Sequence, residues 1–268
     1  MTLQQFTDQM GRIVEFNHPP RRIISLVPSQ TELLFELGLN EEVVGITKFC
    51  IHPTDKFKIT DKVGGTKAIN FEKIRALKPD LIIGNKEENL QEQIEQLMKE
   101  FPVWMSDIHT LDDAVEMITA VGQLVEKEIE ATTLTTKIKN EFLTCTNLFG
   151  PVGSKSPLSV AYFIWKDPYM VAASNTFIDH ILSLIGLENI FSEKERYPEV
   201  TFEDLKKASP DLVFLSSEPY PFKDKHVNEI QKMLPEAQVL LVDGEMFSWY
   251  GSRLQYASNY FQKISFFS

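Results

Sequence analysis

The residues best suited to chemistry lie in loops that follow predicted strands. The segment DGEMFSWYGSR (243–253) comes directly after an apolar run and combines three aromatic rings with acidic side chains and an arginine. Flat rings and a guanidinium suit a large ligand that has a polar rim. Each ring could instead pack inward as part of a small core. For the loop as a group, the pattern favours ligand binding.

Similar side chains follow other predicted strands in both halves of the chain. In open α/β sheets, ligands bind beyond the carboxyl ends of the strands, so these loops are the expected contact points. The rings should contact the faces of the ligand, and the cations its polar or anionic edge. The candidate ligand-binding residues are Phe49, Lys86, Trp165, Tyr169, Arg196, Tyr197, Tyr220, Phe247, Trp249 and Arg253.

The sequence lacks the usual signatures of catalysis and cofactor binding. Its 12 glycines form neither G-x-G-x-x-G nor G-x-x-x-x-G-K-[ST], and no serine lies in G-x-S-x-G. The five histidines show no H-E-x-x-H or comparable spacing. We therefore expect a binding protein and not an enzyme, with no catalytic residue, no cofactor and no metal ion held directly by side chains.

Composition narrows the class further. The 268 residues include 27 Lys and Arg against 38 Asp and Glu, a net charge of −11, which argues against nucleic acid or an anionic membrane as partner. The sequence contains no run of 18 consecutive apolar residues, so no membrane span is predicted. The first residues, MTLQQF, lack a signal-peptide pattern, so a cytoplasmic location and a removed leader both stay open. Whether Cys50 and Cys145 pair stays open as well.

The chain contains an internal repeat. Residues 71–83 (FEKIRALKPDLII) match residues 202–214 (FEDLKKASPDLVF), and the segments on either side also match. Each copy predicts a short amphipathic helix, a Pro-Asp break and an apolar strand. Apolar strands that alternate with helices indicate parallel sheets covered on both faces. The predicted fold class is therefore α/β, with two Rossmann-like lobes and a ligand cleft between them.

Three regions follow from this pattern. Residues 1–110 should form an N-terminal lobe that begins with a β-hairpin, and residues 149–268 a C-terminal lobe. Between them, apolar residues recur at helical spacing over 111–148 without a proline. They predict one long helix that bridges the lobes and limits hinge motion. In the first lobe, Ser29 and Glu32 have the spacing of a capping box.

Glu72 and Glu203 occupy matched positions in the first turns of the repeated helices, where an acid favourably meets the helix dipole. With Thr201 as N-cap, the capping-box position falls to Asp204, and Glu203 is left for other partners. Asn70 is the corresponding cap in the first copy. A matched pair of exposed carboxylates suits a two-fold symmetric partner that carries arginines.

These segments resemble the helical-backbone substrate-binding proteins of ABC importers, which carry cobalamin, haem and ferric siderophores. The resemblance lies in SLVPSQTELLFELGL, in the paired NFEKIRALKPDLII and TFEDLKKASPDLVF segments and in RYPEV, and it covers essentially the whole chain. It implies two α/β lobes bridged by one long helix, and a place in the periplasm or cell envelope. In the cobalamin-binding branch, which is most similar, cleft aromatics match Phe49 and Tyr197, whereas two others match Thr66 and Asn85.

The resemblance implies a non-enzymatic receptor that captures a large metal chelate and delivers it to an ABC permease dimer with its ATPase. A corrinoid is the first expected ligand, and a ferric siderophore or haem the second. Glu72 and Glu203 match the family's docking glutamates, one for each permease subunit, and we expect a monomer. Two alternatives stay open: a two-lobed nucleotide-sugar-type transferase, and a cytosolic chelate-binding protein without a permease.

Overall fold

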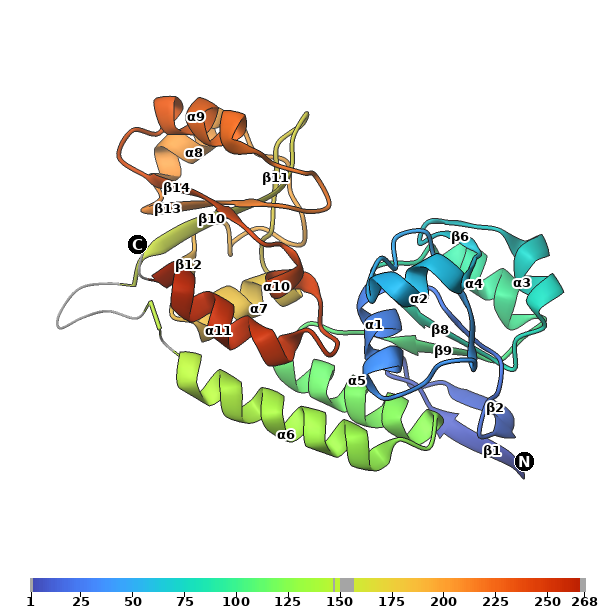
Figure 1. Ribbon diagram of the computed structural model, residues 1–268. Helices are drawn as coiled ribbons and strands as arrows, with labels where there is room; N and C mark the ends of the chain where they lie inside the picture. Colours follow the sequence, from blue (N-terminus) through green and yellow to red (C-terminus); the bar gives the residue numbers. More distant parts are fainter. Residues whose placement is uncertain (1, 147, 150–156, 266–268) are drawn as a thin grey trace. The chain divides into compact units, whose positions relative to one another are not determined.

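The computed structural model describes residues 2–146, 148–149 and 157–265, which fall into two compact units. Unit 1 consists of the described residues up to Ile108 together with Asp112–Lys137 and Tyr250–Arg253, and unit 2 holds the rest. Each unit is built on a five-stranded sheet with helices around it (Figure 1), which confirms the α/β prediction. The predicted start of the second lobe, residue 149, borders residues 150–156, which lie outside the described residues.

The sheet of unit 1 has the order β5-β4-β3-β8-β9, and all its neighbours are parallel. Every residue of β3, β8 and β9 is buried, as expected for a parallel sheet covered on both faces. The five strands are β3 (Ile23–Ser25), β4 (Val43–Ile46), β5 (Asp61–Lys62), β8 (Leu81–Asn85) and β9 (Val103–Ser106). The helices are α1 (Pro28–Glu36), α2 (Thr54–Ile59), α3 (Phe71–Leu77) and α4 (Gln91–Met98).

Two antiparallel hairpins complete unit 1. The first pairs β1 (Thr2–Thr7) with β2 (Ile13–His18), which confirms the predicted N-terminal hairpin. The second is short and pairs β6 (Gly64–Gly65) with β7 (Ala68–Ile69), directly before α3.

Unit 2 repeats the central part of this topology. β10 (Ser159–Trp165), β13 (Leu212–Ser216) and β14 (Gln238–Val242) are parallel neighbours in the same order as β3, β8 and β9. β11 (Met170–Val171) pairs antiparallel with β10, and β12 (Glu188–Asn189) pairs parallel with it. The helices are α7 (Phe177–Leu184), α8 (Phe202–Ala208), α9 (Asp224–Met233), α10 (Glu245–Ser248) and α11 (Leu254–Ser265).

The repeated sequence has the same structural role in both units. Asn70 caps α3 by accepting a hydrogen bond from the Lys73 N–H at 3.0 Å, and Thr201 caps α8 in a capping box with Asp204. These are the predicted caps. The aspartate of each Pro-Asp pair then ties two strands together at their starts. Asp80 accepts hydrogen bonds from the backbone before β3, and Asp211 accepts them from Ser159, the first residue of β10.

The prediction of one unbroken helix over 111–148 is wrong. α5 (Leu111–Leu124) and α6 (Glu128–Cys145) are separate helices (Figure 1). Between them Glu126 adopts a left-handed φ of 55°, which interrupts the helical hydrogen-bond pattern. A Cβ added to Gly122 would lie 2.5 Å from the Ala131 Cβ, so the two helices approach closely beside the turn. Gly122 is therefore the sequence signal for the break.

Candidate functional site

In unit 1, the predicted binding residues Phe49 and Lys86 follow the carboxyl ends of β4 and β8. Phe49 is 51% exposed, and the Lys48 ammonium lies 4.9 Å from its ring centroid. The ring rests on Gly65, where an added Cβ would come within 3.2 Å of it. Lys86 forms an ion pair of 2.5 Å with Asp107. This edge of the sheet therefore presents one aromatic ring and two cationic side chains.

A buried polar network supports these loops. The Asn85 side chain donates to the Ser106 hydroxyl at 2.9 Å and accepts from the backbone N–H groups of Glu87 and Glu88. Asn89 donates to the Thr66 carbonyl at 3.0 Å. Asn85 and Thr66 are only 2% and 9% exposed. Asn85 and Thr66, the two positions at which the resemblance finds no aromatic residue, are therefore tied into the buried hydrogen-bond network beneath these loops.

In unit 2, the exposed Trp165 and the half-buried Tyr220 form an aromatic pair near the carboxyl ends of β10 and β13. Trp165 is 40% exposed, and its ring packs edge-to-face against Tyr220 with the centroids 5.7 Å apart. Tyr220 rests in turn on Phe222 and His226, at centroid distances of 4.8 and 5.6 Å. Tyr220 is held in place by its contacts with these two rings, so it gives the Trp165 ring a fixed packing partner.

Arg196 and Tyr197 lie together on another loop of unit 2. The Arg196 guanidinium is 5.7 Å from the centroid of the Tyr197 ring and donates to the Asn175 carbonyl at 3.4 Å. Arg196 is exposed and Tyr197 is half-buried. The pair offers a cation and part of a ring at the surface.

Tyr169 is half-buried and packs against the core of unit 2, whereas Phe247 lies within a core. The Tyr169 ring packs edge-to-face against Phe163 and Phe202, and its hydroxyl donates to Glu229 at 3.0 Å. Phe247 is fully buried, at 0% exposure, against Tyr162 and other core rings. The predicted ligand contact is contradicted for Phe247, because helix α10 turns this ring away from the surface.

Trp249 is held by a half-buried carboxylate, that of Glu218. Trp249 is 6% exposed, and its Nε1–H donates to Glu218 Oε1 at 2.8 Å. The Ser248 hydroxyl donates to the same oxygen, also at 2.8 Å. Burial raises the pKa of Glu218, and the neighbouring charge of Glu245 adds to this effect. Glu218 is therefore the residue that orients the Trp249 indole.

We expect Glu218→Gln to stabilise the protein at neutral pH. The amide keeps an acceptor for Trp249 and Ser248, and it cannot ionise. Because the folded-state pKa lies above the ordinary value of 4.5, ionisation of Glu218 destabilises the fold as pH rises past that value. In thermal melts, the variant and the wild type should differ least below about pH 4 and diverge above it, with the variant more stable. A pH-independent difference would contradict this, and Glu199→Gln at the exposed Glu199 is the control.

Arg253 forms a two-pronged ion pair with Glu32 inside unit 1. Its Nε and Nη2 donate to the two carboxylate oxygens at 3.0 and 2.6 Å, and the side chains are only 13% and 17% exposed. The capping-box prediction is therefore wrong, because α1 begins after Val27 without a side-chain cap. Gly251 lies so near α1 that an added Cβ would be 2.4 Å from the Ser29 carbonyl oxygen. The segment Tyr250–Arg253 is thus fastened to α1.

Arg253→Met should lower the free energy of unfolding by about 3 kcal/mol, because it leaves the Glu32 carboxylate largely buried without its cation. Urea unfolding at pH 7 measures this change. Adding Glu32→Met should restore much of the loss, since no charge is then left alone. A loss below about 1 kcal/mol in the single variant would show that the pair behaves as a surface salt bridge.

Glu72 and Glu203 are both exposed at the first turns of their helices. The Glu72 side chain is 85% exposed and accepts a hydrogen bond of 2.6 Å from Arg75. Arg75 also donates two hydrogen bonds to Glu100, at 2.8 and 2.7 Å. In unit 2, Asp204 occupies the capping box, so Glu203 is not used as the cap partner.

Within the described ranges, no three His, Cys, Asp or Glu side chains are grouped as metal ligands. No helix formed by these residues combines the length and apolar character needed to cross a bilayer. Cys50 and Cys145 are both buried and reduced, so they do not pair in this structure.

Each α/β unit carries the candidate residues on loops at the carboxyl ends of its parallel strands, where open α/β sheets bind ligands. Residues 23–238 match the family described as periplasmic binding protein, and the chain belongs to this family. It is 28% identical to a vitamin B12-binding protein of Pectobacterium carotovorum over 89% of this chain and 86% of that protein. An uncharacterised ABC transporter substrate-binding lipoprotein of Bacillus subtilis is 26% identical, over 77% of this chain and 67% of its own length.

A solved structure shows the same fold. The periplasmic vitamin B12-binding protein BtuF of Vibrio cholerae superposes with a TM-score of 0.78 at 24% identity, over 93% of this chain and 98% of that one. Together with the family match and the curated relatives, this confirms the predicted resemblance to the helical-backbone binding proteins.

Proposed function

We propose that this chain captures a large metal chelate outside the cytoplasmic membrane and delivers it to an ABC permease. A corrinoid is the first choice. The observation that carries the proposal is the presence of exposed rings, Phe49 in unit 1 and Trp165 in unit 2, on loops at the carboxyl ends of parallel strands. The vitamin B12-binding names of several relatives support the choice of ligand.

The chemistry of these loops suits a chelate with broad apolar faces and a polar edge. Indole, phenyl and phenol rings bind flat faces through apolar contact. Arg196 and the lysines beside Phe49 and Asp107 can meet carbonyl or carboxylate groups at the edge of the ligand. We propose Phe49, Trp165, Tyr197 and Tyr220 as the ring contacts, with Lys86 and Arg196 as the polar ones.

Delivery to a permease dimer rests on the two matched acids. Glu72 and Glu203 lie on equivalent turns of the repeated helices and are both exposed. In this proposal, each carboxylate meets a cation on one permease subunit. The chain itself catalyses no reaction.

A thermal-shift panel tests the choice of ligand. The probes are cyanocobalamin, cobinamide, haem, a ferric hydroxamate, a ferric catecholate, Zn²⁺ and a sugar nucleotide. A ligand at about a hundred times its dissociation constant adds ~2.7 kcal/mol of stability, which should raise the midpoint by several degrees. We expect a shift with a corrinoid. A shift only with haem or a siderophore would replace the corrinoid, and a shift only with the metal ion or the sugar nucleotide would reject the receptor.

A further inference from the structure

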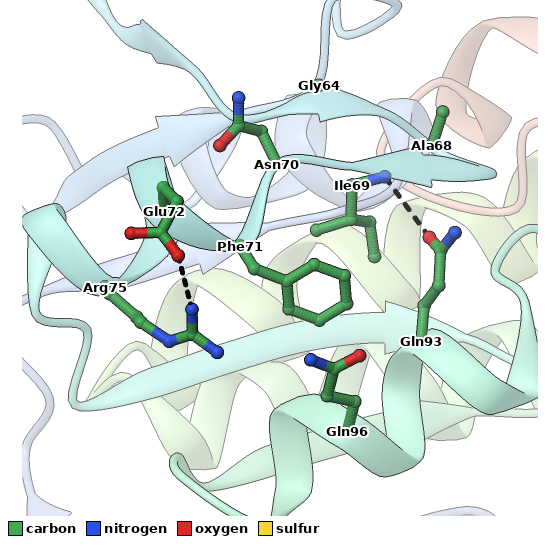
Figure 2. Close-up of a pocket in the computed structure, with 9 residues that line it drawn as sticks. All are labelled: Gly64, Ala68, Ile69, Asn70, Phe71, Glu72, Arg75, Gln93 and Gln96. Carbon is green, nitrogen blue, oxygen red and sulfur yellow. Dashed lines mark hydrogen bonds and ion pairs between the residues drawn. The ribbon is translucent and has the colours of Figure 1, made fainter.

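A broad, open hollow lies beside Glu72 on the surface of unit 1. Its volume is about 770 Å³, and it is lined by the β6–β7 hairpin, the first turns of α3 and one side of α4. Figure 2 shows the Phe71 ring between the Glu72–Arg75 pair on one side and Gln93 and Gln96 on the other. The candidate docking residue therefore stands at the rim of a depression.

The hollow has an apolar floor and a polar rim. Phe71 and Ile69 are half-buried, pack against the core of unit 1 and also line the hollow. On the rim, the Gln93 side chain accepts from the Ile69 N–H at 3.2 Å, which holds the hairpin against α4. Gln96 is exposed on the next turn of α4. An apolar centre surrounded by polar groups is the usual anatomy of a protein–protein contact.

The charges at the rim favour a cationic partner. Arg75 lies between two carboxylates, those of Glu72 and Glu100, so these three side chains carry one negative charge in excess. The contact with Arg75 uses only Oε1 of Glu72. The highly exposed carboxylate can thus accept a second guanidinium at its other oxygen.

Unit 2 differs at the matched position. Phe202, the counterpart of Phe71, packs edge-to-face against Tyr169 with the centroids 5.1 Å apart. Tyr169 is in turn bonded to Glu229, which pairs with Lys166. The ring that forms the floor in unit 1 is therefore partly covered by a side chain of its own unit in unit 2.

We propose that the hollow receives one segment of the permease that carries an arginine next to an apolar side chain. This inference rests on the proposed function. The arginine binds Glu72, the apolar side chain packs on Phe71 and Ile69, and the Gln96 amide bonds to the backbone of the segment. Docking through unit 1 then has a shape requirement as well as a charge requirement.

Filling the hollow tests this inference without touching Glu72. The 268-residue chain, with cyanocobalamin present in excess, is measured for binding to the permease–ATPase complex of the same organism in lipid nanodiscs. Gln96→Trp should weaken docking about tenfold or more, because the indole occupies the space of the incoming side chain. Gln91→Trp is the matched control, since Gln91 is exposed on the same helix but does not line the hollow.

The outcomes separate this inference from the function on which it rests. Gln96→Arg should weaken docking as well, by repelling the guanidinium, whereas Gln91→Arg should not. Chelate affinity should be the same in all four variants. Docking of both Gln96 variants at wild-type strength would overturn the role of the hollow alone. Failure of the wild-type chain to dock would overturn delivery to this permease, and the inference with it.

Discussion

Trp165→Ala should lower the affinity of the chain for its chelate by about thirtyfold or more. Trp165 is the largest exposed ring among the proposed contacts, and Tyr220 supports it from one side. Aromatic residues of this kind are frequent binding hot spots, for which truncation costs about 2 kcal/mol or more, and this corresponds to roughly thirtyfold in the dissociation constant. Isothermal titration with the chelate selected by the thermal-shift panel measures the effect.

Two comparisons make this result specific. Tyr169→Phe removes a hydroxyl bound to Glu229 but leaves the half-buried ring packed on the core, so ligand affinity should stay within about twofold of wild type. The thermal midpoint of Trp165→Ala without ligand should change little, because the side chain is 40% exposed. Wild-type affinity in Trp165→Ala would remove Trp165 from the binding site.

Charge reversal at both docking glutamates should abolish uptake and leave chelate binding intact. In Glu72→Arg with Glu203→Arg, each predicted ion pair with the permease becomes a repulsive pair of cations. Truncating one member of a buried interfacial charge pair already costs ~2–5 kcal/mol, and reversal adds repulsion. Transport of labelled chelate by cells that carry only the double variant, together with titration of the purified protein, measures the two properties separately.

The matched control reverses two other exposed glutamates, one in each unit. Glu41→Arg with Glu193→Arg makes the same change in net charge on exposed residues outside the repeated helices. Uptake should then continue at close to the wild-type rate. Undiminished transport in the Glu72 and Glu203 double variant would reject the docking assignment.

The fold could be predicted from the sequence because its signals are local. The Pro-Asp break, the caps at Asn70 and Thr201 and the apolar strands all act within a few residues. The break between α5 and α6 was missed because the apolar spacing continues across it. Gly122 is the only glycine in the segment and lies near the break. Its role is to allow the close approach of Ala131, and this contact forms only once α6 has turned back along α5.

The site was harder to predict because the partners of the candidate residues come from distant parts of the chain. Residue type alone cannot show that Arg253 forms an ion pair with Glu32. It also cannot show that Glu229 binds Lys166 and Tyr169. Phe247 and Trp165 have similar sequence surroundings after strands, yet one is buried and the other exposed. Their difference arises from α10, a single helical turn, which directs the Phe247 ring into the core.

Equilibrium dialysis of the 268-residue chain against an equimolar mixture of cyanocobalamin, haem, a ferric hydroxamate and a sugar nucleotide tests the central claim most directly. The account predicts that the protein retains one metal chelate at one molecule per chain, with the corrinoid expected first. Retention of the sugar nucleotide alone, or of none of the chelates, would contradict the assignment as a chelate receptor.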